Sequence, residues 1–213
     1  MGLDYKAYRG YLDEAEAQLL TIGATKCNRL LDLTQLSAAV FLLIRAISLF
    51  RSALSHLESG PLDAYDAVRR AYLETWLLAY EFRLEQSGPK AARWHLGYPM
   101  SWSPDIKRIE AYSKSQGIKV PMLGSDYGGL SQLAHPTKAA AENSVAVATA
   151  PHGNSVASRS LSEAKASFER KDVPEMMYRL LWLIIEERKS LIRIEVDLTA
   201  MPAALKYANE YSP

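Results

Sequence analysis

Apolar residues recur at helical spacing near the start of the chain. Within residues 4–31 they fall three or four positions apart, as at Leu12, Ala15, Leu19 and Ile22. This spacing places them on one face of a helix and therefore predicts an amphipathic helix over this segment.

Two more apolar segments follow, and each is ended by a Ser-Gly-Pro triplet. Residues 36–57 are apolar on almost every side, so we expect a helix at the centre of the fold, with Thr34 as its cap. Residues 64–86 form the next predicted helix, and Asp63 is its N-cap candidate. Because the breaks are short, these three helices should pack as antiparallel neighbours.

The middle of the chain, at about residues 90–160, is an insertion rich in Pro, Gly and Ala. Short helices are expected at Lys90–His95 and at Pro104–Ser115, with one or two turns at Tyr127–Ala134. Small residues dominate residues 137–160, where periodicity does not distinguish a helix from a short hairpin or a mobile loop.

A last long helix is predicted from Glu175 to about Leu198, because Pro174 suits a first helical turn. The tail beyond Pro202 is expected to be a short helix or disordered. No alternating series of strands is present. The prediction is an all-α fold: a single helical domain over residues 1–213, with four long helices and with short helices and loops inserted before the last one.

The composition is that of an ordinary globular domain of 213 residues, 48% of them hydrophobic and 23% charged. A net charge of +1 supplies no global field for a polyanion, so any contact with a nucleic acid must rest on a local patch. The lone Cys27 has no disulfide partner, which indicates a reducing compartment. The N-terminus lacks a signal-peptide pattern, and the apolar run at residues 36–50 contains Arg45 and is too short to cross a bilayer. We therefore expect a soluble cytoplasmic protein that makes no membrane contact.

Signatures of cofactor and metal chemistry are missing from the sequence. It contains no Gly-rich nucleotide loop, no His-Glu-x-x-His and no Gly-x-Ser-x-Gly. The four histidines are scattered singly, so their spacing indicates no metal site. No cofactor and no metal are predicted.

The predicted helix at residues 64–86 carries the first candidate site. With about 100° per residue, Glu74 falls about 40° from Arg70, and leucines lie on both sides of the two. Thr75, Arg83 and Arg69 fall on the opposite, polar side. An Arg and a Glu on an apolar face should be paired and partly buried. The pair is either a structural i, i+4 ion pair or an Arg held by Glu so that its other donors bind an anion.

The second candidate site is Tyr127-x-x-x-Ser131-x-x-x-His135-Pro136. The first three residues are spaced by four and would share one side of a helical turn. Pro136 disfavours helical geometry at His135, so the imidazole should lie at the end of the turn, where it can reach a neighbour. The alternative is a buried histidine that only satisfies a backbone carbonyl.

Together, the two motifs resemble a family of poorly characterised bacterial helical proteins related to the HEPN superfamily (higher eukaryote and prokaryote nucleotide-binding). The resemblance covers roughly residues 35–137 and is carried by the following residues: Arg70, Glu74, Tyr127, Leu130, Ser131, His135 and Pro136. It implies a helical bundle that forms a homodimer. It also implies a metal-independent ribonuclease of the kind found in toxin–antitoxin and phage-defence systems.

The usual HEPN mark is an Arg followed, after four to six residues, by a His. Arg51 and His56 have this spacing. Five residues on a regular helix turn by about 500°, however, so these side chains should point about 140° apart and not meet. No Arg stands at the required offset before His135.

Two functions from different classes follow. In the first, the protein binds or cleaves RNA or another phosphate-bearing ligand. Arg70 would stabilise phosphate charge, Glu74 would orient Arg70, His135 would act as general acid or base, and Tyr127 and Ser131 would donate hydrogen bonds. In the second, the network is structural, and the protein is a non-catalytic helical module that acts through dimerisation or a partner protein such as an antitoxin. The first function requires Arg70 and His135 to lie close together.

Overall fold

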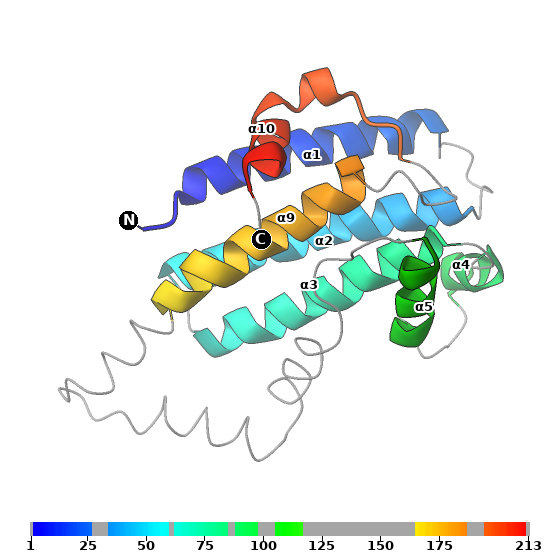
Figure 1. Cartoon of the computed structure of the whole chain (residues 1–213), viewed down its shortest axis with the longest axis horizontal. Coiled ribbons are helices and arrows are strands. Elements are labelled where there is room, and N and C mark those ends of the chain that lie inside the picture. The colour runs from blue at the N-terminus through cyan, green and yellow to red at the C-terminus, as the bar shows by residue number, and fades with distance from the viewer. Residues whose placement is uncertain are drawn as a thin grey trace, which may run out of the picture.

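The computed structural model describes residues 2–26, 34–59, 62–84, 88–97, 105–116, 165–186 and 194–211. All regular secondary structure in these ranges is helical (Figure 1). The elements are α1 (Tyr5–Lys26), α2 (Gln35–Ser59), α3 (Leu62–Phe82), α4 (Gly88–His95), α5 (Ile106–Gln116), η1 (Phe168–Asp172), α9 (Val173–Leu181), η2 (Trp182–Glu186), η3 (Leu198–Ala200) and α10 (Pro202–Glu210).

The predicted all-α fold is confirmed for the part of the chain that the structure describes. The four long helices are α1, α2, α3 and the continuous helical segment of residues 165–186 that contains α9. The short helices α4 and α5 precede the last long helix in the chain, as the sequence predicts.

Helices α1, α2 and α3 alternate in direction, whereas α9 runs parallel to α3 (Figure 1). Three hydrogen bonds join the two segments, and the residue numbers rise together on both sides, as parallel helices require. Tyr72 donates to the carbonyl of Met176, Trp76 to the carbonyl of Arg179, and Arg83 to the carbonyl of Leu183. Parallel neighbours in a bundle require a long connection. The insertion that carries α4 and α5 lies within this connection, beyond the C-terminal end of α3.

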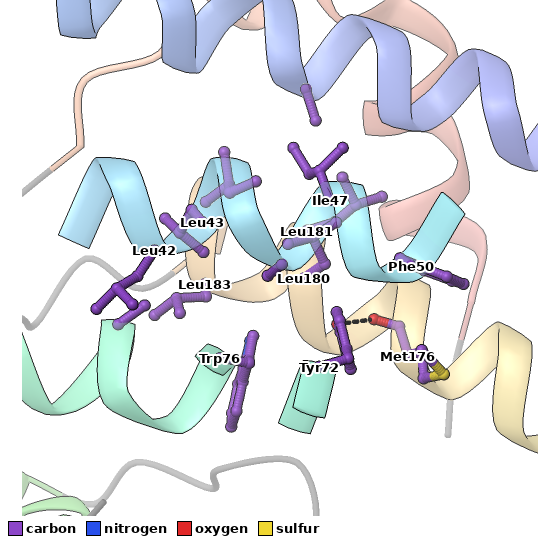
Figure 2. Packing of buried hydrophobic residues seen from close by; sticks show 14 of the residues in the cluster. Leu42, Leu43, Ile47, Phe50, Tyr72, Trp76, Met176, Leu180, Leu181 and Leu183 are labelled. Atoms are coloured by element: carbon purple, nitrogen blue, oxygen red, sulfur yellow. Dashed lines mark hydrogen bonds between the residues drawn. The ribbon is translucent and has the colours of Figure 1, made fainter. Parts of the chain in front are cut away.

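Helix α2 forms the centre of the core, as its all-round apolar sequence predicts. Figure 2 shows apolar side chains of α2 packed among those of α3 and α9, with Ile47 on the side toward α1: Leu42, Leu43, Ile47 and Phe50 from α2, Tyr72 and Trp76 from α3, and Met176, Leu180 and Leu181 from α9. Among the described residues, α2 is also the one helix long and apolar enough to cross a membrane. Because 56% of its most apolar stretch is buried inside the fold, packing in the core accounts for this apolarity.

The caps and ends of the first helices follow the sequence in part. Helix α3 begins at Leu62, so the predicted N-cap Asp63 is wrong: it lies inside the helix. Thr34 caps α2, since its Oγ1 accepts a hydrogen bond from the backbone N–H of Ser37 at 3.1 Å. Helix α3 ends at Phe82, four residues earlier than predicted. The N–H groups of Arg83 and Leu84 turn back to carbonyls three residues before them, at 3.0 Å, which tightens and ends the helix.

The last long helix differs from its prediction. Residues 165–174 are already helical, ahead of the predicted start at Glu175, so Pro174 lies inside a continuous helical segment. The wide π turn η1 precedes this proline, and the N–H of Val173 reaches back five residues to the carbonyl of Phe168. A π turn is a local change of helical pitch, and this one accommodates a ring that would clash with a regular preceding turn. Residues 194–197 are not helical, and Pro202–Glu210 forms the short helix α10, one of the two predicted alternatives for the tail.

Candidate functional site

Arg70 and Glu74 form the predicted pair on α3. The Nε of Arg70 donates to Oε1 of Glu74 at 2.9 Å. The Arg70 side chain is 14% exposed and that of Glu74 37% exposed, so the pair is partly buried, as predicted. The neighbouring Leu73, Leu77 and Leu78 are buried, and they provide the apolar face on which the pair lies.

The pair orients Arg70 more than it stabilises the fold. An i, i+4 ion pair with one partner open to solvent contributes about 0.3–0.5 kcal/mol. A carboxylate on Nε, however, fixes the plane of the guanidinium, and a guanidinium presents five donors in a rigid fork. An oriented Arg of this kind suits a phosphate or a carboxylate.

The other three predicted site residues, Tyr127, Ser131 and His135, lie outside the described residues, and so does the expected helical turn at 127–134. The residues at 137–160 also lie outside them. The predicted approach of His135 to Arg70 therefore stays a prediction.

Arg51 has a structural role in the described part of the chain. Its Nη2 lies 2.6 Å from Oδ1 of Asp13, and its Nη1 lies 2.7 Å from Oε2 of Glu16. Both carboxylates belong to α1, so Arg51 holds α1 against α2. The prediction that Arg51 and His56 point apart stays a prediction.

His95 is also held in place by the fold. Its Nε2 lies 2.9 Å from Oγ of Ser37 and 3.2 Å from the carbonyl oxygen of Thr34. The ring packs edge-on against Phe41. These contacts join α4 to the first turn of α2.

A buried charge cluster at the C-terminal end of α3 was not predicted from the sequence. The side chain of Glu81 is 1% exposed. Both of its carboxylate oxygens accept hydrogen bonds from Nζ of Lys90 at 2.8 Å. The N–H of Asp105 donates to Oε2 at 3.0 Å, and Nη1 of Arg108 lies 3.8 Å from Oε1. Glu81 thus joins α3 to α4 and to the start of α5.

One feature of the α3 sequence could have indicated that Glu81 is buried and paired. Glu81 falls about 20° from Arg70, on the same apolar face, and a buried carboxylate needs a partner. The partners come from two short helices after a proline, however, and periodicity does not determine how such helices dock.

The predicted polar side of α3 is wrong in part. Thr75 and Arg83 are buried, and Arg69 is 15% exposed and binds Oδ2 of Asp172 at 3.1 Å. The guanidinium of Arg83 donates to the carbonyl of Leu183. The predicted position of Arg83 is wrong because α3 ends at Phe82, so Arg83 no longer follows the helical periodicity. Arg69 is shielded from solvent because Asp172 of η1 binds it.

The tyrosines of α3 serve as buried donors. The hydroxyl of Tyr72 donates to the carbonyl of Met176 at 2.6 Å, and burial raises the pKa of Tyr72 far above its ordinary value. Burial likewise raises the pKa of Tyr65. Phenols that resist ionisation in this way hold α3 to α9 and are poor general bases.

Within the described ranges, no group of three or more His, Cys, Asp or Glu side chains is placed to hold a metal ion.

Comparisons with known protein families, with curated proteins and with solved structures gave no match for this chain.

Proposed function

We propose that this protein is a HEPN-like helical protein that binds a phosphate of RNA through Arg70 and cleaves the strand without a metal ion. The observation that carries the proposal is the contact of 2.9 Å between Nε of Arg70 and Oε1 of Glu74. It holds a guanidinium in one orientation on a helix face that opens partly to solvent. The bundle of four long helices supports the proposal at the level of architecture.

The proposed reaction uses side chains from both candidate motifs, the Arg70–Glu74 pair and the segment from Tyr127 to His135. His135, acting as a base, removes the proton of the ribose 2′-OH, and the 2′ oxygen attacks the neighbouring phosphorus. The bond from phosphorus to the 5′ oxygen breaks, that oxygen takes a proton from a water molecule, and the protonated His135 later returns its proton to the solvent. The products are a 2′,3′-cyclic phosphate and a 5′-hydroxyl.

Arg70 stabilises the negative charge that grows on the phosphate oxygens, and Glu74 keeps Arg70 aligned. Tyr127 and Ser131 donate hydrogen bonds to the same phosphate. General acid–base catalysis of this kind needs no metal. In this role the protein acts as a toxin or a defence protein, forms a homodimer and, as a toxin, has a neutralising partner protein.

A second function is favoured by a specific observation. The Arg70–Glu74 pair has the i, i+4 spacing that stabilises helices by itself, and the chain as a whole carries a net charge of only +1. In this reading, the protein is a non-catalytic interaction module whose charged pairs hold the bundle together.

Cleavage of an RNA oligonucleotide that carries a fluorophore and a quencher distinguishes the two functions. The full-length protein should cleave it in the presence of EDTA, and Arg70→Ala and His135→Ala should each lower the rate about 10²-fold or more. Glu74→Gln, which keeps an oxygen acceptor for Nε, should lower the rate less than Arg70→Ala does.

Arg9→Ala is the matched control, because Arg9 on α1 forms an exposed ion pair with Glu58 on α2, and no residue of α3 is part of that pair. It should cleave at the rate of the unmodified protein. If no RNA is cleaved and the variants change only the melting temperature, the interaction module is the correct function.

A further inference from the structure

Helix α2 keeps one stripe of its surface open to solvent, although the rest of the helix is central to the core. Six residues fall within about 80° of arc on this stripe, which is about 27 Å long: Phe41, Arg45, Ser48, Ser52, Ser55 and Ser59. Phe41 is 47% exposed, Ser52 is partly exposed and the other four are exposed. Their spacing alternates between four and three residues, as in the seam between two packed helices. We call these six residues the α2 seam.

The α2 seam lacks the charges that usually cover the outer face of a surface helix. Arg45 is its one charged residue, and Glu58 is the one acidic residue of α2. Three of the serine hydroxyls donate to the carbonyl four residues before them, at 3.0–3.2 Å: those of Ser48, Ser55 and Ser59. Because these hydroxyls are satisfied within α2, the seam presents small side chains that a second helix can approach closely.

Apolar side chains lie beside the seam near its first residue, Phe41. Asp13 of α1 contacts Arg51 of α2 at 2.6 Å. Leu20 lies seven residues after Asp13, and Ile44 lies seven residues before Arg51. Because α1 and α2 are antiparallel, Leu20 and Ile44 face each other two turns away from that contact. Leu20 is 54% exposed, so it adds apolar contact area to that of Phe41.

The order of side-chain sizes along the α2 seam is complementary to itself. When a second copy of α2 runs antiparallel with its Ser59 level with Phe41, its Ser55 comes level with Arg45 and its Ser52 with Ser48. Each large side chain then meets a small one, and small side chains meet where the two helices cross. Large residues opposite small ones are the arrangement in which facing helices interdigitate.

Charge favours the same arrangement. A parallel pairing places Arg45 against Arg45 of the second copy, and like charges placed opposite one another oppose association. The antiparallel pairing separates the two Arg45 residues by about 15 Å along the axis. It also brings Glu58 of the second copy, which lies one turn beyond Ser55, to the side of Arg45. The Glu58 side chain is 45% exposed, so its carboxylate is open to this contact.

A lipid surface is the poorer occupant. Protein segments that bind anionic lipids carry clusters of about four to eight Lys or Arg residues, whereas the α2 seam carries Arg45 alone. Four of its six residues are serines, which offer a bilayer little apolar area.

From this self-complementary order we infer that the α2 seam is the contact between two copies of this chain, packed antiparallel across a two-fold axis between Ser48 and Ser52. In such an isologous contact each pair of residues occurs twice, so Phe41 meets Ser59 and Arg45 meets Ser55 at both ends. The inference deepens the homodimer of the proposed function, on which it rests, by naming its surface and its orientation.

Sedimentation equilibrium of the full-length chain at micromolar concentrations tests the seam. The unmodified chain of 23.7 kDa should form a dimer. Ser55→Arg places a guanidinium against Arg45 of the second copy, and Arg45→Glu places a carboxylate beside Glu58 of the second copy. Each variant should raise the Kd of dimerisation at least about tenfold, because like charges meet at the contact.

The double variant Arg45→Glu, Ser55→Arg should recover most of the affinity. It places the introduced carboxylate of each copy opposite the introduced guanidinium of the other. Within one chain the two positions are about 15 Å apart along α2, so recovery requires the second copy in the antiparallel arrangement. A coupling of this kind between two substitutions identifies a direct contact.

The control variant Lys206→Glu, Asn209→Arg makes the same changes of charge at exposed positions on α10, and it should dimerise like the unmodified chain. Thermal melts followed by circular dichroism should show that all variants are folded, because every substituted side chain is exposed. The inference is overturned if the unmodified chain is monomeric, if both single variants dimerise normally, or if the double variant is as weak as the single variants.

Cleavage assays on the same proteins separate the inference from the proposed function. If the double variant restores the dimer but no RNA is cleaved by the unmodified chain, the seam holds and the ribonuclease proposal fails. If a monomeric chain cleaves RNA, the ribonuclease proposal holds and the seam does not. A monomeric chain that cleaves no RNA contradicts both.

Discussion

The Nζ of Lys90 lies 2.8 Å from each of the two carboxylate oxygens of Glu81. The Glu81 side chain is buried and the Lys90 side chain is 19% exposed, so the carboxylate is solvated by protein groups rather than by water. This contact joins α4 to α3, and the bond from the N–H of Asp105 to the same carboxylate joins the start of α5 to α3.

Glu81→Ala should lower the free energy of unfolding by about 3–5 kcal/mol. The substitution leaves Lys90 without its carboxylate and the N–H of Asp105 without its acceptor, and breaking a buried ion pair from one side has a cost of this size. Glu81→Gln should cost less, because it keeps one oxygen acceptor. Glu110→Ala on exposed α5 surface is the control and should change stability by less than about 0.5 kcal/mol. Urea unfolding measures all three, and a loss below about 1 kcal/mol for Glu81→Ala would contradict this account of the junction.

Arg70→Ala should destabilise the fold less than Glu81→Ala does, by roughly 1 kcal/mol. The reason is that Glu74 is 37% exposed, so water hydrates the carboxylate that the substitution leaves behind. Urea unfolding and the RNA-cleavage assay on the same preparation should therefore show a large loss of rate with a small loss of stability. Equal stability losses for the two variants would indicate that Arg70 is as structural as Glu81.

Alkaline pH should unfold the protein through its buried tyrosines. Burial raises the pKa of Tyr65, Tyr72 and Tyr207 in the folded state. A raised folded pKa means that the folded state keeps its protons while the unfolded state loses them. Stability is therefore unaffected well below the unfolded pKa of about 10 and falls as the pH rises above it.

Each such tyrosine should contribute a slope of about 1.4 kcal/mol per pH unit above pH 10. Urea unfolding at several pH values measures this slope, and phenolate absorbance shows whether ionisation waits for unfolding. Tyr72→Phe removes one of these hydroxyls, so the loss of stability per pH unit should become smaller by about 1.4 kcal/mol. A stability that stays flat to pH 12 would show that these hydroxyls ionise in the folded protein.

Thr34→Ala should lower stability by about 1 kcal/mol, because it removes the oxygen that accepts the N–H of Ser37 in the first turn of α2. Thr34→Ser keeps that oxygen and should be close to neutral. Thr25→Ala is the control, since Thr25 lies exposed within α1 and its hydroxyl only bonds the carbonyl of Thr21. Thermal melts of the three variants should give the lowest melting temperature for Thr34→Ala. Equal melting temperatures for Thr34→Ala and Thr34→Ser would show that the Thr34 hydroxyl does not cap α2.

His56→Ala should cleave RNA at the unmodified rate, although Arg51 and His56 have the spacing of the usual HEPN mark. Arg51 binds Asp13 and Glu16 on α1, so Arg51→Ala should instead reduce stability by about 1 kcal/mol, and less at high salt. The two readouts are the cleavage rate and the urea midpoint. A large loss of rate in His56→Ala would place the catalytic histidine on α2 and not at His135.

Local properties of the chain were enough to predict much of this protein. The all-α fold, the central place of α2, the cap at Thr34, the short helices α4 and α5 and the partly buried pair of Arg70 and Glu74 each depend on residues within a few turns of one another. Helical periodicity, capping and i, i+4 spacing act over that range, so the sequence determined them by itself.

Tertiary structure alone decided where the remaining polar groups went. Glu81 is buried because α4 and α5 fold back over it, and Arg83 is buried because α3 ends one residue before it and the carbonyl of Leu183 lies within reach. The last helix could extend N-terminal to Pro174, through residues 165–173, because a π turn accommodates that proline. The burial of Glu81 and of Arg83 depends on groups about 10 to 100 positions away, and side-chain periodicity within one helix holds no information about a partner at that distance. The π turn joins groups only five residues apart, but periodicity does not distinguish it from a regular turn.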